Sequence, residues 1–134
     1  MTTQMNPYIF SNDARAQAEF YSSALGGEIQ SVMTFGQIPG TPEENKDKVM
    51  HMVLTVAGGN VLFLSDSFEP VTANSSRSMA LALTFNDLAK AQEAYAGLGK
   101  GGTDKYPLEL QPWGAHYGEV EDKFGILWQV TTQG

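Results

Sequence analysis

Residues 12–21 read Asn-Asp-Ala-Arg-Ala-Gln-Ala-Glu-Phe-Tyr, and residues 86–95 read Asn-Asp-Leu-Ala-Lys-Ala-Gln-Glu-Ala-Tyr. The two stretches lie 74 positions apart, and their Asn, Asp, Glu and Tyr positions coincide. A second pair of stretches, residues 59–64 and 125–130, also corresponds. Self-similarity at a long period indicates one structural unit used more than once. The chain is therefore predicted to contain two copies of one small module.

Each module reads as a strand, a helix and three further strands. The Asn-Asp pair can cap the free N–H groups of a helix start, and the residues that follow are rich in Ala, Gln and Glu, which favour a helix. Helices are predicted at residues 14–25 and 88–98, each followed by a glycine that permits a left-handed stop. The predicted strands are residues 7–11, 27–35, 48–57 and 60–66, and then residues 80–85, 102–110, 115–121 and 126–132.

This order predicts an α+β fold made of two βαβββ modules in tandem. We expect a single domain over residues 1–134. Module one covers about residues 5–66, a linker about 67–78, and module two about 79–132. The loop at residues 36–47, with two prolines and several charges, is expected to be exposed. The sequence leaves open whether this loop closes over a binding cleft.

Alternation along the strands predicts which face of each sheet packs on its helix. Met50, Met52, Leu54 and Val56 alternate with His51, Val53 and Thr55, while Leu81, Leu83 and Phe85 alternate with Ala80, Ala82 and Thr84. Because successive strand residues point to opposite faces, the large apolar sets are expected under the helices. The opposite faces are expected to line a shared concave cleft.

The charge balance argues against nucleic acid and membrane partners. The 134 residues include 8 Lys and Arg against 15 Asp and Glu, a net charge of −7. A chain this acidic is poorly suited to phosphate backbones or anionic lipid, and no apolar run approaches the roughly 20 residues that span a bilayer. The absence of cysteine excludes disulfides and thiolate metal sites. The first residues lack a secretory pattern, so a cytoplasmic protein is expected.

The pattern Tyr8-Ile9-Phe10, Ala18-Glu19-Phe20-Tyr21 and Ala24-Leu25-Gly26 resembles the start of vicinal-oxygen-chelate proteins, the glyoxalase, bleomycin-resistance and dioxygenase superfamily. Residues 33–36, 49–52, 113–118 and 122–128 are similar to its PhnB-like branch, often labelled demethylubiquinone methyltransferase-like. The resemblance covers nearly the whole chain and implies a glyoxalase-like curled sheet around a cleft. It does not select an activity, because the superfamily includes lyases, dioxygenases, transferases and drug binders.

The resemblance also implies where a metal would bind. Members of the superfamily place His, His, Glu and Glu or Gln on the first and last strands of the two modules, a set suited to a divalent metal. The matching positions here are Asn6, Phe63, Ala80 and Gln129. Catalytic metal sites usually have three good protein ligands, and neither Phe63 nor Ala80 can ligate. The usual metal centre is therefore expected to be absent, and no cofactor is predicted.

His51 and Glu119 are the candidate catalytic residues. His51 lies mid-strand on the expected cleft face, where an imidazole can transfer protons near neutral pH. The alternative is a half-buried histidine bonded to a neighbouring strand or to Tyr117. Glu119 shares strand parity with Tyr117 and could face the cleft. The candidate ligand-binding set is Asn6, His51, Phe63, Trp113, Tyr117 and Gln129, whereas Trp128 is expected to pack under a helix.

Three functions remain open. The first is a protein that binds a small, partly aromatic molecule in its cleft without the usual metal centre. The second is an enzyme of the same superfamily, of lyase, dioxygenase or transferase type, that uses His51 or Glu119 in proton transfer. The third is an interaction protein with a largely closed cleft. A homodimer is expected in each case, because members of the superfamily commonly pair. The sequence favours the binder and leaves the ligand unidentified.

Overall fold

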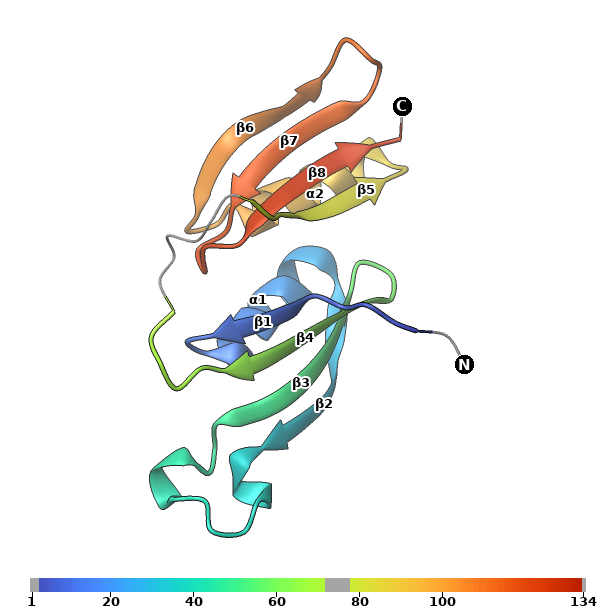
Figure 1. The fold of residues 1–134 in the computed structure, drawn as a ribbon. Coiled ribbons are helices and arrows are strands. Elements are labelled where there is room, and N and C mark those ends of the chain that lie inside the picture. The colour runs from blue at the N-terminus through green and yellow to red at the C-terminus, as the bar shows by residue number, and fades with distance from the viewer. Residues whose placement is uncertain (1–2, 72–77, 134) are drawn as a thin grey trace. The chain divides into compact units, whose positions relative to one another are not determined.

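The computed structural model describes residues 3–71 and 78–133. The chain divides into two units, and the boundary along the sequence falls between Val71 and Thr72. We keep the names module one and module two for these units and describe each by itself. In each module one helix packs against one face of a four-stranded sheet (Figure 1). The predicted α+β fold with tandem βαβββ modules is confirmed. The shared cleft stays a prediction, and residues 72–77 of the predicted linker lie outside the described residues.

Module one consists of β1 (Tyr8–Ser11), α1 (Ala14–Leu25), β2 (Gly27–Thr34), β3 (Val49–Val56) and β4 (Asn60–Asp66). Its strand order is β1-β4-β3-β2, in which β1 and β4 are parallel and the other neighbours are antiparallel. The register places Tyr8 opposite Phe63, which in turn lies opposite Val53.

Module two repeats this arrangement with β5 (Leu81–Phe85), α2 (Leu88–Leu98), β6 (Thr103–Leu110), β7 (His116–Glu121) and β8 (Leu127–Thr132). Its order is β5-β8-β7-β6, with β5 and β8 parallel. Here Ala82 lies opposite Gln129, which lies opposite Glu119. Ala82, Gln129 and Glu119 therefore occupy the places that Tyr8, Phe63 and Val53 hold in module one.

The helix starts follow the prediction, but only one of the two helix ends does. Asp13 accepts a 3.1 Å hydrogen bond from the backbone N–H of Ala16, and Asp87 caps α2 by accepting a 2.8 Å bond from the N–H of Ala89. Gly26 ends α1 in the left-handed region at φ 71°. The same prediction for Gly99 is wrong, because Gly99 keeps helical geometry at φ −78° and the left-handed residue, Gly101, follows in the turn.

The core of each module lies between its helix and the covered face of its sheet. The buried apolar side chains of β3 and β4 are Val49, Met52, Leu54, Val56, Leu62 and Leu64. Met50 is not part of this row, contrary to the alternation prediction. Met33 pairs with His51 and Thr34 pairs with Val49, so Met50 is the extra residue of a β-bulge. Trp128 is buried as predicted.

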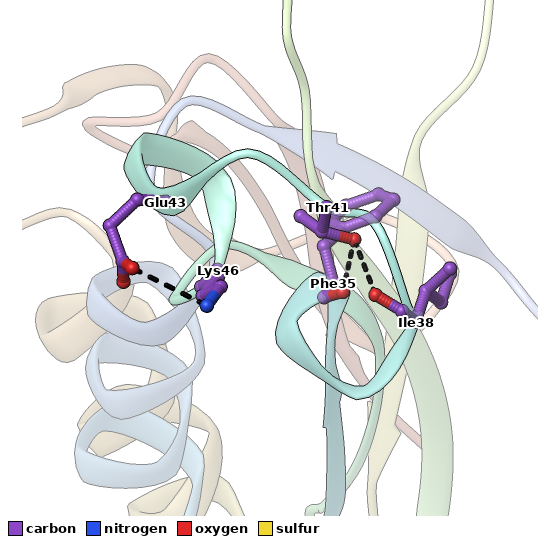
Figure 2. Close-up of polar contacts among 5 residues, drawn as sticks. All are labelled: Phe35, Ile38, Thr41, Glu43 and Lys46. Carbon is purple, nitrogen blue, oxygen red and sulfur yellow. Dashed lines mark hydrogen bonds and ion pairs between the residues drawn. The ribbon is translucent and has the colours of Figure 1, made fainter.

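The loop between β2 and β3 is exposed, as predicted, and contains two short 3₁₀ helices, η1 (Phe35–Gln37) and η2 (Glu43–Asn45). The Thr41 hydroxyl forms a bifurcated hydrogen bond, 2.7 Å from the carbonyl oxygen of Phe35 and 2.9 Å from that of Ile38 (Figure 2). Lys46 pairs with Glu43 at 3.3 Å (Figure 2). These contacts are local, so the loop has a defined shape of its own.

Both helices are short, at 12 and 11 residues. Within residues 3–71 and 78–133, no helix combines the length and apolar character needed to cross a membrane.

Candidate functional site

Four rings gather on the face of the module-one sheet that is turned away from α1. Tyr8 and Phe10 come from β1, His51 from β3 and Phe63 from β4, and we call these residues the aromatic cluster. The ring centroids are 5.0 Å apart for His51 and Phe63, 5.1 Å for Tyr8 and Phe10, 5.6 Å for Tyr8 and His51, and 6.1 Å for Tyr8 and Phe63. These distances are typical of interacting aromatic rings.

Strand pairing explains why the rings meet. Because β1 runs parallel to β4, Tyr8 lies directly across from Phe63, and alternation puts Phe10 on the same face as Tyr8. The side chains are open to solvent, with Tyr8 41% and Phe10 62% exposed. Sequence reasoning found His51 and Phe63 but missed Tyr8 and Phe10. Their strand parity, shared with Asn6, was the signal that could have found them.

The imidazole of His51 is held by a partner two strands away. The Tyr8 hydroxyl lies 3.1 Å from Nδ1 of His51. When the phenol O–H donates and the neutral imidazole nitrogen accepts, the ring proton sits on Nε2. On β2, Met33 is the register partner of His51. The rings of Tyr8 and Phe63 therefore pack near the imidazole, which supports the interpretation of His51 as bonded within its own sheet.

The equivalent face of module two is polar. The Tyr117 hydroxyl donates a 2.6 Å hydrogen bond to Oε2 of Glu119, and Gln129 lies across from Glu119 with the small Ala82 on its other side. Burial, the hydrogen bond to Glu119 and the negative charge of that carboxylate raise the pKa of Tyr117 to about 12. The phenol therefore stays protonated near neutral pH, and it donates its proton to the hydrogen bond with Glu119.

Two further predicted ligand-binding residues lie away from these groups. The Asn6 side chain donates a 3.3 Å hydrogen bond to the carbonyl oxygen of Val61, which continues the pairing of the N-terminal segment with β4. Trp113 lies in the turn between β6 and β7 and is 66% exposed. The structure therefore groups His51 with Phe63 and groups Tyr117 with Glu119 and Gln129.

The donor set does not fit the metal centre that the resemblance implies. Phe63 belongs to the aromatic cluster, Ala80 has no donor atom, and the amide of Asn6 is used in strand pairing. Within residues 3–71 and 78–133, no three His, Cys, Asp or Glu side chains are grouped so that they could hold a metal ion. Asn6 and Gln129 each offer a weak amide oxygen, which together are fewer than the three good ligands that such sites use.

Two carboxylates at the ends of β4 and β7 are committed to the backbone. Asp66 accepts 2.7 Å hydrogen bonds from the N–H groups of Ala14 and Val49, one on each oxygen. Asp122 is buried and accepts a 2.8 Å hydrogen bond from the indole N–H of Trp128, as well as bonds from the turn that follows it. Both carboxylates hold the fold together, as expected for acidic residues at strand ends.

A shallow hollow lies at another part of module one. Its volume is about 330 Å³, and it is open to solvent between the end of α1 and the β3–β4 turn. Its lining residues are Gly26, Gly27, Glu28, Thr55, Val56, Gly58 and Gly59. At three of these glycines an added Cβ would meet nothing within 4 Å, so the hollow is open space beside backbone rather than a packed pocket.

Comparison with known proteins assigns the family. Residues 4–130 match the Glyoxalase/Bleomycin resistance protein/Dioxygenase superfamily. The chain belongs to this superfamily. Among superfamily relatives in sequence, the Mycobacterium bovis protein Mb0911c is 30% identical over 94% of this chain and 80% of that protein.

Solved structures agree with this assignment. Protein PA1353 from Pseudomonas aeruginosa has a TM-score of 0.82 and 30% identity, covering 98% of each chain. The PhnB protein from Bacillus cereus, described as a putative 3-demethylubiquinone-9 3-methyltransferase, has a TM-score of 0.80 and 22% identity, covering 98% of this chain and all of that one. The second likeness concerns the fold alone. The resemblance seen in the sequence is confirmed.

Proposed function

We propose that this superfamily member binds a small planar aromatic molecule on the aromatic cluster and does so without the superfamily's metal centre. The observation that carries the proposal is the set of four neighbouring rings on the sheet face turned away from α1, with Tyr8 and Phe10 exposed. Exposed apolar groups that are contiguous mark binding surfaces more often than scattered ones do. Aromatic rings stack with planar partners and contribute about 0.5–1.5 kcal/mol per pair beyond buried area.

The contrast between the repeats adds support. The places of Tyr8, His51 and Phe63 are taken in module two by Ala82, Tyr117 and Gln129. One copy of the unit therefore carries rings where the other carries a small residue and hydrogen-bonding groups. This difference is not needed by the fold, which both copies share, so it points to a role in recognition.

Affinity measurements on matched variants test the proposal. The probes are 2-naphthoate and naphthalen-2-ylmethylammonium, which share a flat ring and differ in charge. Phe10→Ala is expected to weaken both by about fivefold, because about 1 kcal/mol of stacking is lost. Phe68→Ala is the control, since Phe68 is 57% exposed, stacks on Phe35 and is not part of the aromatic cluster. If neither probe binds, or if both variants lose the same affinity, the aromatic cluster is not the binding surface.

The metal-free part of the proposal needs its own test. Elemental analysis of the purified protein is expected to find no stoichiometric metal, and thermal-shift titration with divalent metals is expected to leave the melting temperature unchanged. A ligand that binds the folded state tightly raises that temperature. One bound metal per chain, or clear stabilisation, would mean that the donor mapping is wrong, and His51, Glu119 and Gln129 would become candidate ligands.

The enzymatic alternative rests on His51. Glu119 already accepts the short hydrogen bond from Tyr117, whereas the imidazole of His51 is partly exposed and oriented by Tyr8. An oriented imidazole is a common proton-transfer group. This alternative predicts a reaction that His51→Ala abolishes while the far-UV circular dichroism spectrum stays unchanged. Binding of aromatic compounds without any product would favour the binder.

A further inference from the structure

The hydrogen bond between Tyr8 and His51 divides the imidazole into two ends. Nδ1 of His51 lies 3.1 Å from the Tyr8 hydroxyl. Within residues 3–71 and 78–133, the hydrogen bond found for the imidazole is the one at Nδ1. Phe63 lies against the same ring, with centroids 5.0 Å apart. The imidazole is thus held by a hydrogen bond and by ring packing. Nε2 is left as the nitrogen that can meet a molecule bound on the aromatic cluster.

The orientation of the proton follows from the partner. When the Tyr8 O–H donates to Nδ1, the neutral imidazole must carry its proton on Nε2 and present an N–H donor. When the imidazole is protonated, both nitrogens donate, Tyr8 has to accept, and Nε2 still presents an N–H, now with a positive charge. Nε2 is a donor in both protonation states when the Tyr8 O–H donates to the neutral imidazole.

We propose that Tyr8 is a positioning residue that fixes Nε2 of His51 as a hydrogen-bond donor, and that the ligand of the aromatic cluster is therefore a planar aromatic compound with an acceptor at its edge, in particular an aromatic carboxylate or phenolate. This inference rests on the proposed function and adds the chemical class of the ligand. A charge-assisted bond to a carboxylate is stronger than one between neutral groups. Binding of an aromatic anion therefore tightens as His51 becomes protonated.

In the described part of the chain, the groups around the imidazole of His51 supply no negative charge that would compete with a ligand carboxylate. From β1 the facing titratable group is the phenol of Tyr8, from β4 the neighbour is Phe63, and from β2 the register partner is Met33. The nearby cation on the same chain segment, Lys48, lies 5.8 Å above the ring of Phe68. Among the groups that contact His51 in the described part of the chain, no carboxylate is found, so a ligand carboxylate would not have to displace one from the imidazole.

The experiment compares the two naphthalene probes over a pH series from about 5 to about 8, the range in which histidines titrate. We expect 2-naphthoate to bind more tightly than naphthalen-2-ylmethylammonium, although the net charge of −7 favours the cation at long range. We also expect naphthoate affinity to rise about tenfold toward the acid end, as an ion pair with hydrogen bonding replaces a neutral contact. His51→Gln keeps a side-chain N–H donor and is expected to abolish this pH dependence, which separates His51 from the general loss of negative charge.

Tyr8→Phe is the decisive variant, because it keeps the ring and removes the hydroxyl. It frees the neutral imidazole to move its proton to Nδ1, so naphthoate affinity is expected to fall about fivefold near pH 8. In the protonated imidazole both nitrogens carry protons in either protein, so the affinities are expected to converge toward the acid end of the series. Equal loss at both pH values would mean that Tyr8 is merely structural. If both probes bind equally and Tyr8→Phe changes neither, this inference is wrong while the proposed function stands. If neither probe binds, both are wrong.

Discussion

Replacing Asp66 by alanine is expected to destabilise module one more than any ordinary surface change. One oxygen of the carboxylate accepts the N–H of Ala14 in the first turn of α1, and the other accepts the N–H of Val49 at the start of β3, both at 2.7 Å. Ala14 and Val49 are fully buried. Asp66→Ala therefore leaves two donors without a partner and removes a negative charge from the positive end of a helix.

The magnitude follows from these two bonds. A hydrogen bond to a charged group contributes about 1.5–3 kcal/mol, so the free energy of unfolding of module one is expected to fall by about 3–5 kcal/mol. With a urea m-value of about 2 kcal/mol/M, the midpoint falls by about 2 M. Asp66→Asn is expected to cost nearly as much, because its amide N–H₂ meets one of the two N–H groups donor to donor.

Urea unfolding followed by far-UV circular dichroism measures the effect on the chain. Both tryptophans, Trp113 and Trp128, belong to module two, so their fluorescence follows that module separately. The control is Asp47→Ala at an exposed position, where a change below about 0.5 kcal/mol is expected. If Asp66→Ala costs less than about 1 kcal/mol, the carboxylate does not join α1 to the sheet as we describe.

Three other predictions concern the sheet faces. In a spectroscopic alkaline titration Tyr117 is expected to ionise late, near pH 12, and Glu119→Gln should lower that pKa. Because the pKa of Tyr117 is raised in the folded state, the associated stability is present below the ordinary pKa of about 10. This stability is lost as the pH rises toward 12. An ionisation near 10 in the native protein would contradict the hydrogen bond. Gly118→Ala puts a methyl group 2.8 Å from the Leu108 Cα, so the free energy of unfolding in urea is expected to fall by about 1–3 kcal/mol. An unchanged urea midpoint would show that β6 can shift to make room. His51→Ala removes one exposed hydrogen bond and is expected to cost about 1 kcal/mol or less; unfolding at room temperature would mark His51 as a core residue.

The fold could be predicted from the sequence because local signals and the repeat agree. The bounds of α1, α2 and β4 match the prediction. The two helix starts were readable because Asp13 and Asp87 cap the helices in both copies. What failed depends on contacts that no local pattern encodes. The bulge at Met50 comes from the pairing of β2 with β3, and the helical geometry at Gly99 comes from how the chain turns toward β6.

The candidate site was predicted only in part. His51 and Phe63 were found because strand parity is readable from the sequence. The part played by Tyr8 depends on the parallel register of β1 on β4, which brings its hydroxyl to Nδ1 of His51 across an intervening strand. A long-range register of this kind cannot be read from one chain segment. The bond of Tyr117 to Glu119, by contrast, joins side chains two positions apart, and the sequence did place both on one face.

The central claim is that an aromatic ligand rests on the aromatic cluster, and NMR of the aromatic side chains tests it most directly. As 2-naphthoate is added, the ring signals of Tyr8, Phe10 and Phe63 are expected to shift in proportion to occupancy, while those of Phe68 stay in place as the internal reference. Saturable binding in which Tyr8, Phe10 and Phe63 do not move would contradict the account, because the ligand would then lie somewhere other than on the open face of module one.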